Sequence, residues 1–269
     1  MTDAREDWRE RVVTRRKLPV PEVPPLRPDD PDMRVMLAIP MERTVDQMAL
    51  FGFWAIAMQG WPLARLEYTR NDIARCKFTE FLLSGDYTHL LMLDSDHVHP
   101  PDIVQRLARW FRAYPDEVQV CGGLNFRRGE PFDPCAFIDP GDGAFRRMAD
   151  WGQPGAIEVE ALGSGCIMIA RTAFEALQER GLAGEPGQPW FGYDYSIDGW
   201  PGTDMWFSAR CRQAGVTLWC DTTTTSPHIG RLLIDETTYR AWVAEHLEAT
   251  EEGEGEDCVD PAAEPVAAE

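Results

Sequence analysis

Short apolar runs alternate with longer helix-compatible segments between residues 34 and 121, and this alternation strongly restricts the fold. The runs at 34–39 and 88–93 are almost entirely apolar, which is typical of strands buried on both faces of a parallel sheet. Repeated strand–helix–strand units predict a mainly parallel sheet with helices on both faces. We expect strands at 34–39, 63–68, 88–93 and 118–121, and helices at 44–59, 71–83 and 101–113.

Beyond residue 121 the apolar pieces become shorter, and turns rich in Gly and Asp separate them. This change predicts smaller, partly antiparallel strands beside the main sheet. Further strands are expected at 135–138, 157–162, 166–170 and 216–220, and helices at 203–214 and 235–247. The pattern therefore predicts an α/β fold, a single Rossmann-like domain with a mainly parallel sheet and a smaller antiparallel portion.

The two ends of the chain differ from this central part in composition. Six prolines lie between residues 19 and 31, and prolines at this density favour extended backbone and stay out of sheet interiors. Residues 251–269 hold eight acidic and no basic side chains, which predicts a disordered tail. We expect a Pro-rich N-terminal arm at 1–32, the working domain at 33–249 and the acidic tail at 250–269.

The chain is strongly acidic, with 45 Asp and Glu against 26 Lys and Arg and a net charge of −19. Such a charge repels phosphate backbones and anionic lipid, so it disfavours a general nucleic-acid or membrane-surface binder. Three arginines at 106, 109 and 112 fall on one predicted helix. A local patch of this kind leaves contact with a nucleic acid open.

Cysteine usage and hydropathy bear on the compartment. The seven cysteines include no Cys-x-x-Cys pair, and most lie in apolar stretches, as expected for reduced, buried thiols. The N-terminal residues lack the apolar core of a signal peptide, and no apolar run reaches the roughly 20 residues that a membrane span needs. We expect a cytoplasmic protein without a membrane span.

The predicted strand at 88–93 runs directly into Asp94, Ser95 and Asp96. Ligands of parallel sheets bind at the carboxyl ends of strands, and two carboxylates there suit Mg²⁺ or Mn²⁺, which can in turn hold a diphosphate. The alternative is an acidic loop that only precedes the next helix. The position at a strand end favours the metal-binding interpretation.

Further segments follow in a fixed order: Pro40 with Arg43, Asp72 to Arg75, Gly163 to Arg171, Gly202 to Phe207, and Ser226 to Gly230. Together with the Asp-x-Asp pair, this set resembles the nucleotide-sugar-dependent glycosyltransferases of the A-type fold, particularly their compact bacterial and phage members. The resemblance covers nearly all of residues 33–249. It implies an enzyme that transfers a sugar from a nucleoside diphosphate sugar, with UDP or GDP as the expected nucleotide.

The resemblance also implies which residues bind the donor. The metal, Mn²⁺ or Mg²⁺, would be held by Asp94, Asp96 and His228, and the imidazole favours Mn²⁺. Residues expected to contact the nucleotide sugar are Pro40, Arg43, Asp46, Arg75, Asp94, Ser95 and Asp96. A structural pairing of Arg75 with Asp94 is an alternative to its ligand role.

On the acceptor side the resemblance implies Asp204 as the general base, although Thr203 stands where the family usually has Glu. Helix N-termini favour Asp for structural reasons too. Residues expected near the acceptor are Gly163, Ser164, Gly165, Trp190, Tyr193 and Trp200, the aromatic ones forming a lid. The acceptor itself, a glycan, a protein or a small molecule, is left open by the sequence.

Three other functions remain compatible with these residues. A sugar-nucleotide or glycan-binding protein without turnover would keep the same fold. A phage-type transferase would glycosylate modified DNA bases, which the acidic charge disfavours. A metal-dependent phosphoesterase would normally need a denser set of His and Asp ligands than a chain with five histidines offers.

Overall fold

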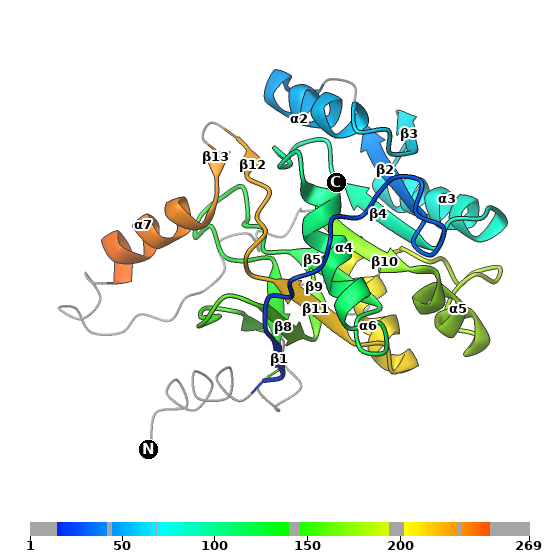
Figure 1. Cartoon of the computed structure of the whole chain (residues 1–269). Helices are drawn as coiled ribbons and strands as arrows, with labels where there is room; N and C mark the ends of the chain where they lie inside the picture. Colours follow the sequence, from blue (N-terminus) through cyan, green and yellow to red (C-terminus); the bar gives the residue numbers. More distant parts are fainter. Residues whose placement is uncertain are drawn as a thin grey trace, which may run out of the picture.

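The computed structural model describes residues 15–41, 45–67, 69–139, 146–193, 202–230 and 233–247; the segment at 250–269 lies outside this part. An eight-stranded sheet forms its centre, in the order β1-β8-β11-β5-β10-β4-β2-β3 (Figure 1). β8 and β10 run opposite to the other six strands, so the prediction of a mainly parallel sheet is confirmed. The strands are β1 Lys17–Leu18, β2 Val35–Met41, β3 Leu63–Glu67, β4 His89–Leu93, β5 Val120–Gly123, β8 Ala156–Val159, β10 Cys166–Ala170 and β11 Leu218–Asp221.

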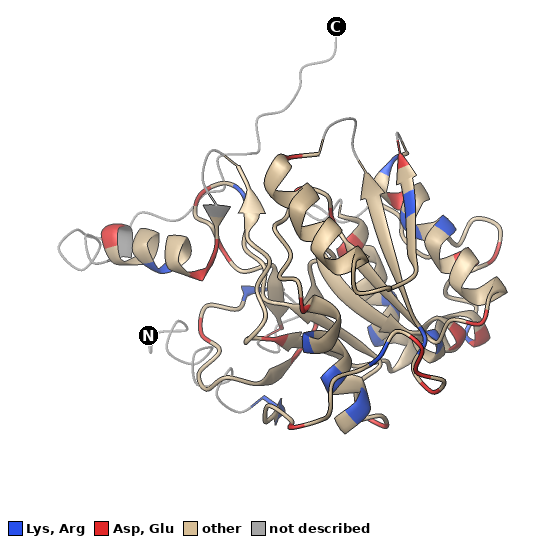
Figure 2. Cartoon of the chain, turned by 45° about the horizontal axis from the view of Figure 1, so that its top comes forward, with Lys and Arg blue, Asp and Glu red and all other residues tan. Residues whose placement is uncertain are grey.

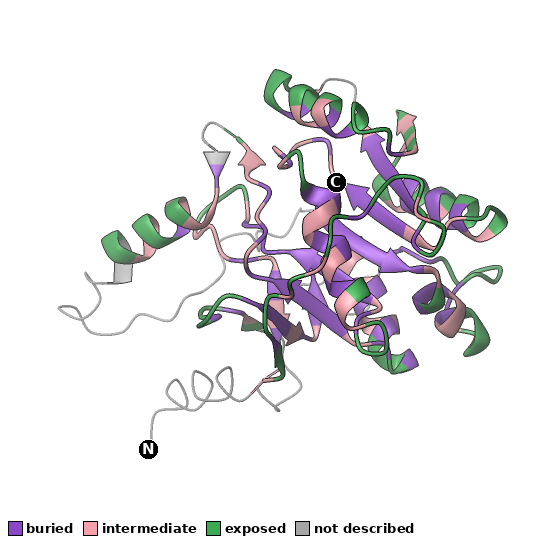
Figure 3. Ribbon diagram, in the orientation of Figure 1, coloured by how far each residue is buried: buried purple, intermediate pink, exposed green. Residues whose placement is uncertain are grey.

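Helices cover both faces of this sheet. On one face, α2 (Gln47–Ala57) and α4 (Ile103–Ala113) bury apolar side chains in a common core cluster. On the other, α3 (Asn71–Ser84), α5 (Arg171–Glu179) and α6 (Thr203–Ala214) contribute to a second cluster. Figure 3 shows buried residues along the strands and exposed residues on the outer sides of the helices. The fold is a three-layer α/β sandwich, as the alternating sequence predicts.

Two small antiparallel sheets complete the described part. β6 (Ala136–Ile138) lies between β7 (Arg146–Arg147) and β9 (Ala161–Leu162), which confirms the smaller antiparallel portion. β12 (His228–Ile229) pairs with β13 (Leu233–Ile234) and leads into α7 (Glu236–Leu247). The Tyr239 ring of α7 packs on Phe126, 5.6 Å between centroids, and this contact ties the last helix to the domain.

Some details of the sheet differ from the sequence-based expectation, and the strand expected at 157–162 is divided into β8 and β9, which belong to different sheets. β2 continues through Pro40 to Met41, although the proline was expected to end it. Its pairing with β4 stops at Ala38, so beyond that point β2 has a strand partner on one side and tolerates a proline. β10 is inserted antiparallel between β4 and β5, a direction that the sequence did not indicate.

The described part of the N-terminal arm lies against the domain. β1 pairs with β8 at the edge of the sheet, and Leu18 and Leu26 are buried in the same core cluster as α2 and α4. Gln105 of α4 accepts a hydrogen bond from the backbone N–H of Leu26 (2.6 Å) and donates one to its carbonyl (2.7 Å). The arm is thus fixed along the outer face of α4.

The three arginines of α4 are paired inside the molecule. Arg106 binds Asp102, Arg109 binds Asp221, and Arg112 donates to the carbonyl of Pro24. The three arginines line a groove of about 540 Å³ between α4 and the arm, and each of them is bound to its partner there. Figure 2 shows basic residues interspersed with acidic ones. None of the helices in the described ranges is both long and apolar enough to cross a bilayer.

Candidate active site

The site lies where β4 ends, and a backbone pairing between distant segments assembles it. Beyond β4 the chain makes hydrogen bonds with the segment around β12: Val98 N–H donates to the Pro227 carbonyl (2.8 Å), and Ile229 N–H donates to the Asp96 carbonyl (2.7 Å). This pairing brings the His228 side chain to Asp96, 132 positions earlier in the sequence. The structure thus brings together Asp96 and His228, two of the three residues expected to hold the metal.

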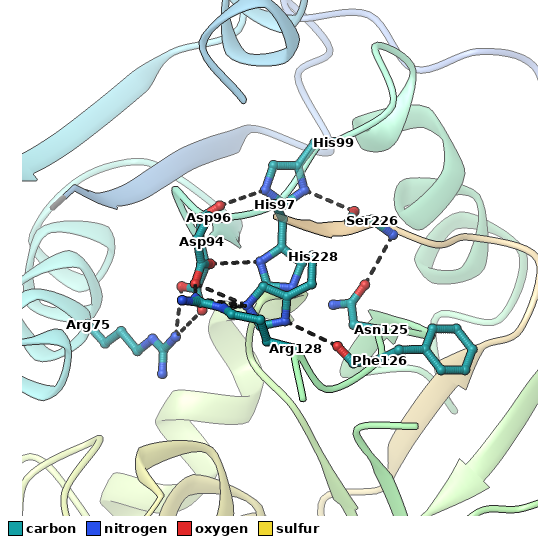
Figure 4. A network of polar contacts seen from close by, with 10 residues as sticks. All are labelled: Arg75, Asp94, Asp96, His97, His99, Asn125, Phe126, Arg128, Ser226 and His228. Atoms are coloured by element: carbon teal, nitrogen blue, oxygen red, sulfur yellow. Dashed lines mark hydrogen bonds and ion pairs between the residues drawn. The ribbon is translucent and has the colours of Figure 1, made fainter. Parts of the chain in front are cut away.

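Asp96, His97 and His228 form a compact group of potential metal ligands (Figure 4). Asp96 Oδ1 lies 2.9 Å from His97 Nδ1, and Asp96 Oδ2 lies 3.1 Å from His228 Nε2. The two imidazoles stack with their centroids 4.1 Å apart. Burial alone would raise the pKa of Asp96, but the hydrogen-bonded imidazoles of His228 and His97 outweigh it and hold that pKa well below its usual range. Asp96 is therefore an anion near neutral pH.

The donor set of this group fits a divalent cation. One ligand atom from each of the three residues lies within 4.8 Å of the other two. A carboxylate with two imidazoles suits a divalent transition-metal ion, Mn²⁺ among them, and leaves coordination positions for water or a ligand. A cationic side chain already lies among these atoms, since Arg128 donates to Asp96 and contacts His228. The site thus attracts positive charge.

Asp94 has a different partner from the one that the expected metal set gives it. Arg75 of α3, with 4% of its side chain exposed, donates to both carboxylate oxygens of Asp94 at 2.8 and 2.9 Å. Its other terminal nitrogen donates to the Thr203 hydroxyl at 2.6 Å. Burial opposes the charge of Arg75, but Asp94 outweighs it and raises the pKa of the guanidinium. Thr203 therefore binds Arg75 through a neutral hydroxyl, whereas a Glu at this position would bind it through a carboxylate.

A cavity of about 270 Å³ opens beside these groups. Its lining includes Arg75, Asp94, His97, His228 and Asp204. Asp204 lies in the first turn of α6, and its carboxylate accepts a hydrogen bond from Met205 N–H at 3.1 Å. Burial raises the pKa of Asp204 above its ordinary value, and Arg75 opposes the rise. A carboxylate of raised pKa is a stronger base than an exposed one.

The glycine turn before β10 forms another part of the cavity lining, together with Ser164. A Cβ on Gly165 would lie 2.8 Å from the His97 ring, and one on Gly163 would lie 2.7 Å from Cys135. Both positions therefore need glycine because of close contacts. The Gly165 carbonyl also accepts a hydrogen bond from Asp94 N–H (2.9 Å), which fixes the turn to the end of β4.

Four polar residues of the site were not among the predicted site residues: His97, His99, Asn125 and Arg128. His99, 1% exposed, joins the two segments: one ring nitrogen donates to the Asp94 carbonyl and the other accepts from the Ser226 hydroxyl, both at 2.9 Å. Burial lowers the pKa of His99 to about 3, so the ring is neutral. Asn125 lines the cavity, and its buried Nδ2 has no hydrogen-bond partner among the described residues. That amide is available to a ligand oxygen.

The remaining predicted residues have diverse positions. Pro40 is buried within β2, Ser95 is buried beside Asp94, and Asp46 is the N-cap of α2, where it accepts from Met48 N–H at 2.7 Å. Tyr193 lines the cavity. Trp190 is 4% exposed and packs edge-on against Phe174 in the core, so the structure does not bring it into the cavity as a lid. Arg43 and Trp200 lie outside the described residues.

The comparisons with known proteins give information on the fold alone. No family model matches the sequence, and no curated protein is similar to it. The structure "Crystal Structure of A197 from STIV" is 18% identical, covers 74% of this chain and 86% of its own, and has a TM-score of 0.50.

Two further structures have lower scores. "Crystal structure of GalNAc-T7 with UDP, GalNAc and Mn2+" is 13% identical and covers 78% of this chain and 47% of its own, with a TM-score of 0.44. A structure of CMP:2-keto-3-deoxy-manno-octonic acid synthetase complexed with CTP is 11% identical over 81% of this chain and 99% of its own, with a TM-score of 0.39. The likeness to A197 shows a shared α/β fold.

Proposed function

We propose that the chain is a metal-dependent glycosyltransferase of the A-type fold, which moves a sugar from a nucleoside diphosphate sugar to an acceptor hydroxyl. One observation carries this proposal: His97 and His228 of the candidate metal group line the same cavity as Asp204, a carboxylate with a raised pKa. The transfer needs a cation site for the donor and a base for the acceptor within one cavity.

On the donor side, Asp96, His97 and His228 would hold Mn²⁺ or Mg²⁺. The bound ion would neutralise negative charge that develops on the leaving diphosphate. Arg75 holds Asp94 rigidly at the cavity wall, where that carboxylate can accept hydrogen bonds from hydroxyl groups of the donor. Asn125 can donate to a donor oxygen through its unpartnered amide. UDP and GDP are the nucleotides that we propose to test first.

On the acceptor side, Asp204 would take the proton of the acceptor hydroxyl as its oxygen bonds to the anomeric carbon. The bond between that carbon and the diphosphate breaks, and the electron pair leaves with the diphosphate. The turn at 163–165 lets the backbone approach the sugar closely, because its glycines carry no side chains. The acceptor would be a glycan, a protein or a small molecule with a free hydroxyl.

Calorimetric titration of UDP, GDP, CDP and dTDP, each with Mn²⁺ and again with a chelator, tests the donor site. We expect one nucleotide to bind only with metal, and Asp96→Asn or His228→Ala to lower that affinity at least about tenfold, since metal ligands are lost. Asp102→Asn is a matched control, because Asp102 is an exposed carboxylate paired with Arg106 on α4. Metal-independent binding, or no binding of any nucleotide, would contradict the proposal.

Turnover separates the transferase from a binding protein with the same site. Release of the nucleoside diphosphate from its sugar, stimulated by an acceptor, would identify the enzyme. We further propose a reducing, cytoplasmic environment, which is supported by the six free cysteines of the described part.

A further inference from the structure

Arg128 lies in the segment between β5 and β6, and its guanidinium bridges Asp96 and His228 (Figure 4). Its Nη2 donates to Asp96 Oδ2 and lies 3.2 Å from His228 Nε2. His228 Nδ1 lies 3.1 Å from the Phe126 carbonyl, and this contact orients the ring. The other ring nitrogen, Nε2, lies 3.1 Å from Asp96 Oδ2. Arg128 therefore contacts both atoms of this Asp96–His228 pair through one terminal nitrogen.

The guanidinium and a metal ion exclude each other. Asp96 Oδ2 and His228 Nε2 belong to the candidate metal group and are the two atoms that Arg128 Nη2 contacts, so an ion held by them would compete with the guanidinium. Metal binding consequently requires Arg128 to leave.

Arg128 is able to leave, whereas Arg75 is not. The Arg128 side chain is 54% exposed, so rotation into solvent disturbs no core contact. Arg75 is 4% exposed, and both of its terminal nitrogens are bonded to Asp94 and Thr203. Arg75 is also the one arginine among the described residues that line the cavity. A diphosphate that enters with the metal would therefore find in Arg128 a nearby cation that is able to change its partner.

We propose that Arg128 exchanges anions during the binding cycle: it pairs with Asp96 in the metal-free protein and with the donor diphosphate once metal is bound. This inference rests on the proposed function. Metal alone must displace Arg128 and leave it in water, whereas metal together with a nucleotide gives it a new anionic partner. Metal and nucleotide therefore bind with positive coupling, and by linkage each strengthens the other equally.

Calorimetry of Arg128→Gln tests the exchange, with Mn²⁺ alone as the first titrant and UDP, or GDP if UDP does not bind, at saturating Mn²⁺ as the second. We expect Arg128→Gln to bind Mn²⁺ about two- to tenfold more tightly than the wild type does, because the competing cation is absent. The nucleotide should bind more weakly by about the same factor, because it loses a charge-assisted contact. Arg128→Lys keeps the charge but lacks the planar guanidinium. Its affinities for Mn²⁺ and for the nucleotide should lie between those of the wild type and Arg128→Gln.

Arg127→Gln is the matched control, since Arg127 is the neighbouring, partly exposed arginine and faces Asp133 instead. It should change neither affinity. Unchanged or weaker Mn²⁺ binding by Arg128→Gln, or unchanged nucleotide affinity, overturns the exchange while wild-type binding of both ligands still supports the transferase. If neither wild type nor Arg128→Gln binds Mn²⁺, both the exchange and the proposed function are wrong.

Discussion

Asp204 combines two opposing influences in one carboxyl group. The N-terminus of α6 favours its ionised form, whereas burial raises its pKa. Such a carboxylate is a stronger base than an exposed aspartate, as the proposed proton transfer from an acceptor hydroxyl requires. This balance suits the proposed general base at a position in the first turn of a helix.

Replacement of Asp204 by Asn is expected to lower kcat by about 10²- to 10⁴-fold, the usual contribution of a general base. Nucleotide affinity should change less than about threefold, because the amide keeps the size of the side chain. Steady-state kinetics and calorimetry on the same variant measure the two effects. A variant with wild-type kcat would remove Asp204 from the mechanism.

The pH dependence of the wild type gives an independent measure. Because the folded-state pKa of Asp204 is raised, its carboxylate takes up a proton at a higher pH than an exposed aspartate does. We expect kcat/KM to decline on the acid side at a pH above the ordinary aspartate value of about 3.9. An acid limb at or below that value would be inconsistent with Asp204 as the base.

At the level of single residues, the sequence predicts the site residues that belong to a local pattern. The Asp94–Asp96 pair follows an apolar run, and this alone places both carboxylates at a strand end. Arg128 and Asn125 have no comparable pattern, because their importance depends on contacts across about a hundred positions, with His228 and Ser226. Such contacts are set by the tertiary fold.

Among the elements, the N-terminal arm contributes to the core through a few apolar side chains. Leu26 is 3% exposed, so Leu26→Ala should reduce the free energy of unfolding by about 2–4 kcal/mol, from lost burial and the cavity that remains. Val20→Ala, in the same arm at 41% exposure, should change it by less than about 0.5 kcal/mol. Chemical denaturation of both variants makes the comparison, and equal effects would show that the arm does not pack as described.

The types of the regular elements could be predicted, but not every direction. Buried strands are apolar whichever way they run, so the run at β10 predicts a strand without revealing that it lies antiparallel between β4 and β5. Hydrophobic periodicity likewise finds α6 at 203–214, where the helix is observed. Direction and neighbour order depend on the long connections, whose sequences carry no regular pattern.

For the whole molecule, acid sensitivity follows from a histidine held neutral under α4. The His89 ring packs edge-on against Phe111, 4.9 Å between centroids, and burial lowers its pKa to about 4. The unfolded chain takes up this proton near pH 6.5, whereas the folded chain does not. The free energy of unfolding should therefore fall by about 2 kcal/mol between pH 7.5 and 5 from this residue alone.

Denaturation curves of wild type and His89→Gln at both pH values isolate this effect. The glutamine variant should lose about 2 kcal/mol less on acidification than the wild type, whatever its stability at pH 7.5. All other titrating groups are common to both proteins and cancel in the difference. Identical pH dependence in the two proteins would mean that His89 can be protonated in the folded state.

The backbone pairing between residues 96–98 and 227–229 has a consequence for biosynthesis. During translation the β4 strand and the carboxylates that follow it leave the ribosome well before Ser226 and His228. His228 completes the candidate metal group, and Ser226 supports the Asp94 backbone through His99. A nascent chain that lacks these late residues has most of the sheet but no complete cation site. Under the proposed function, metal uptake at this position requires these late residues, and a chain that ends before Ser226 is expected to bind neither metal nor donor.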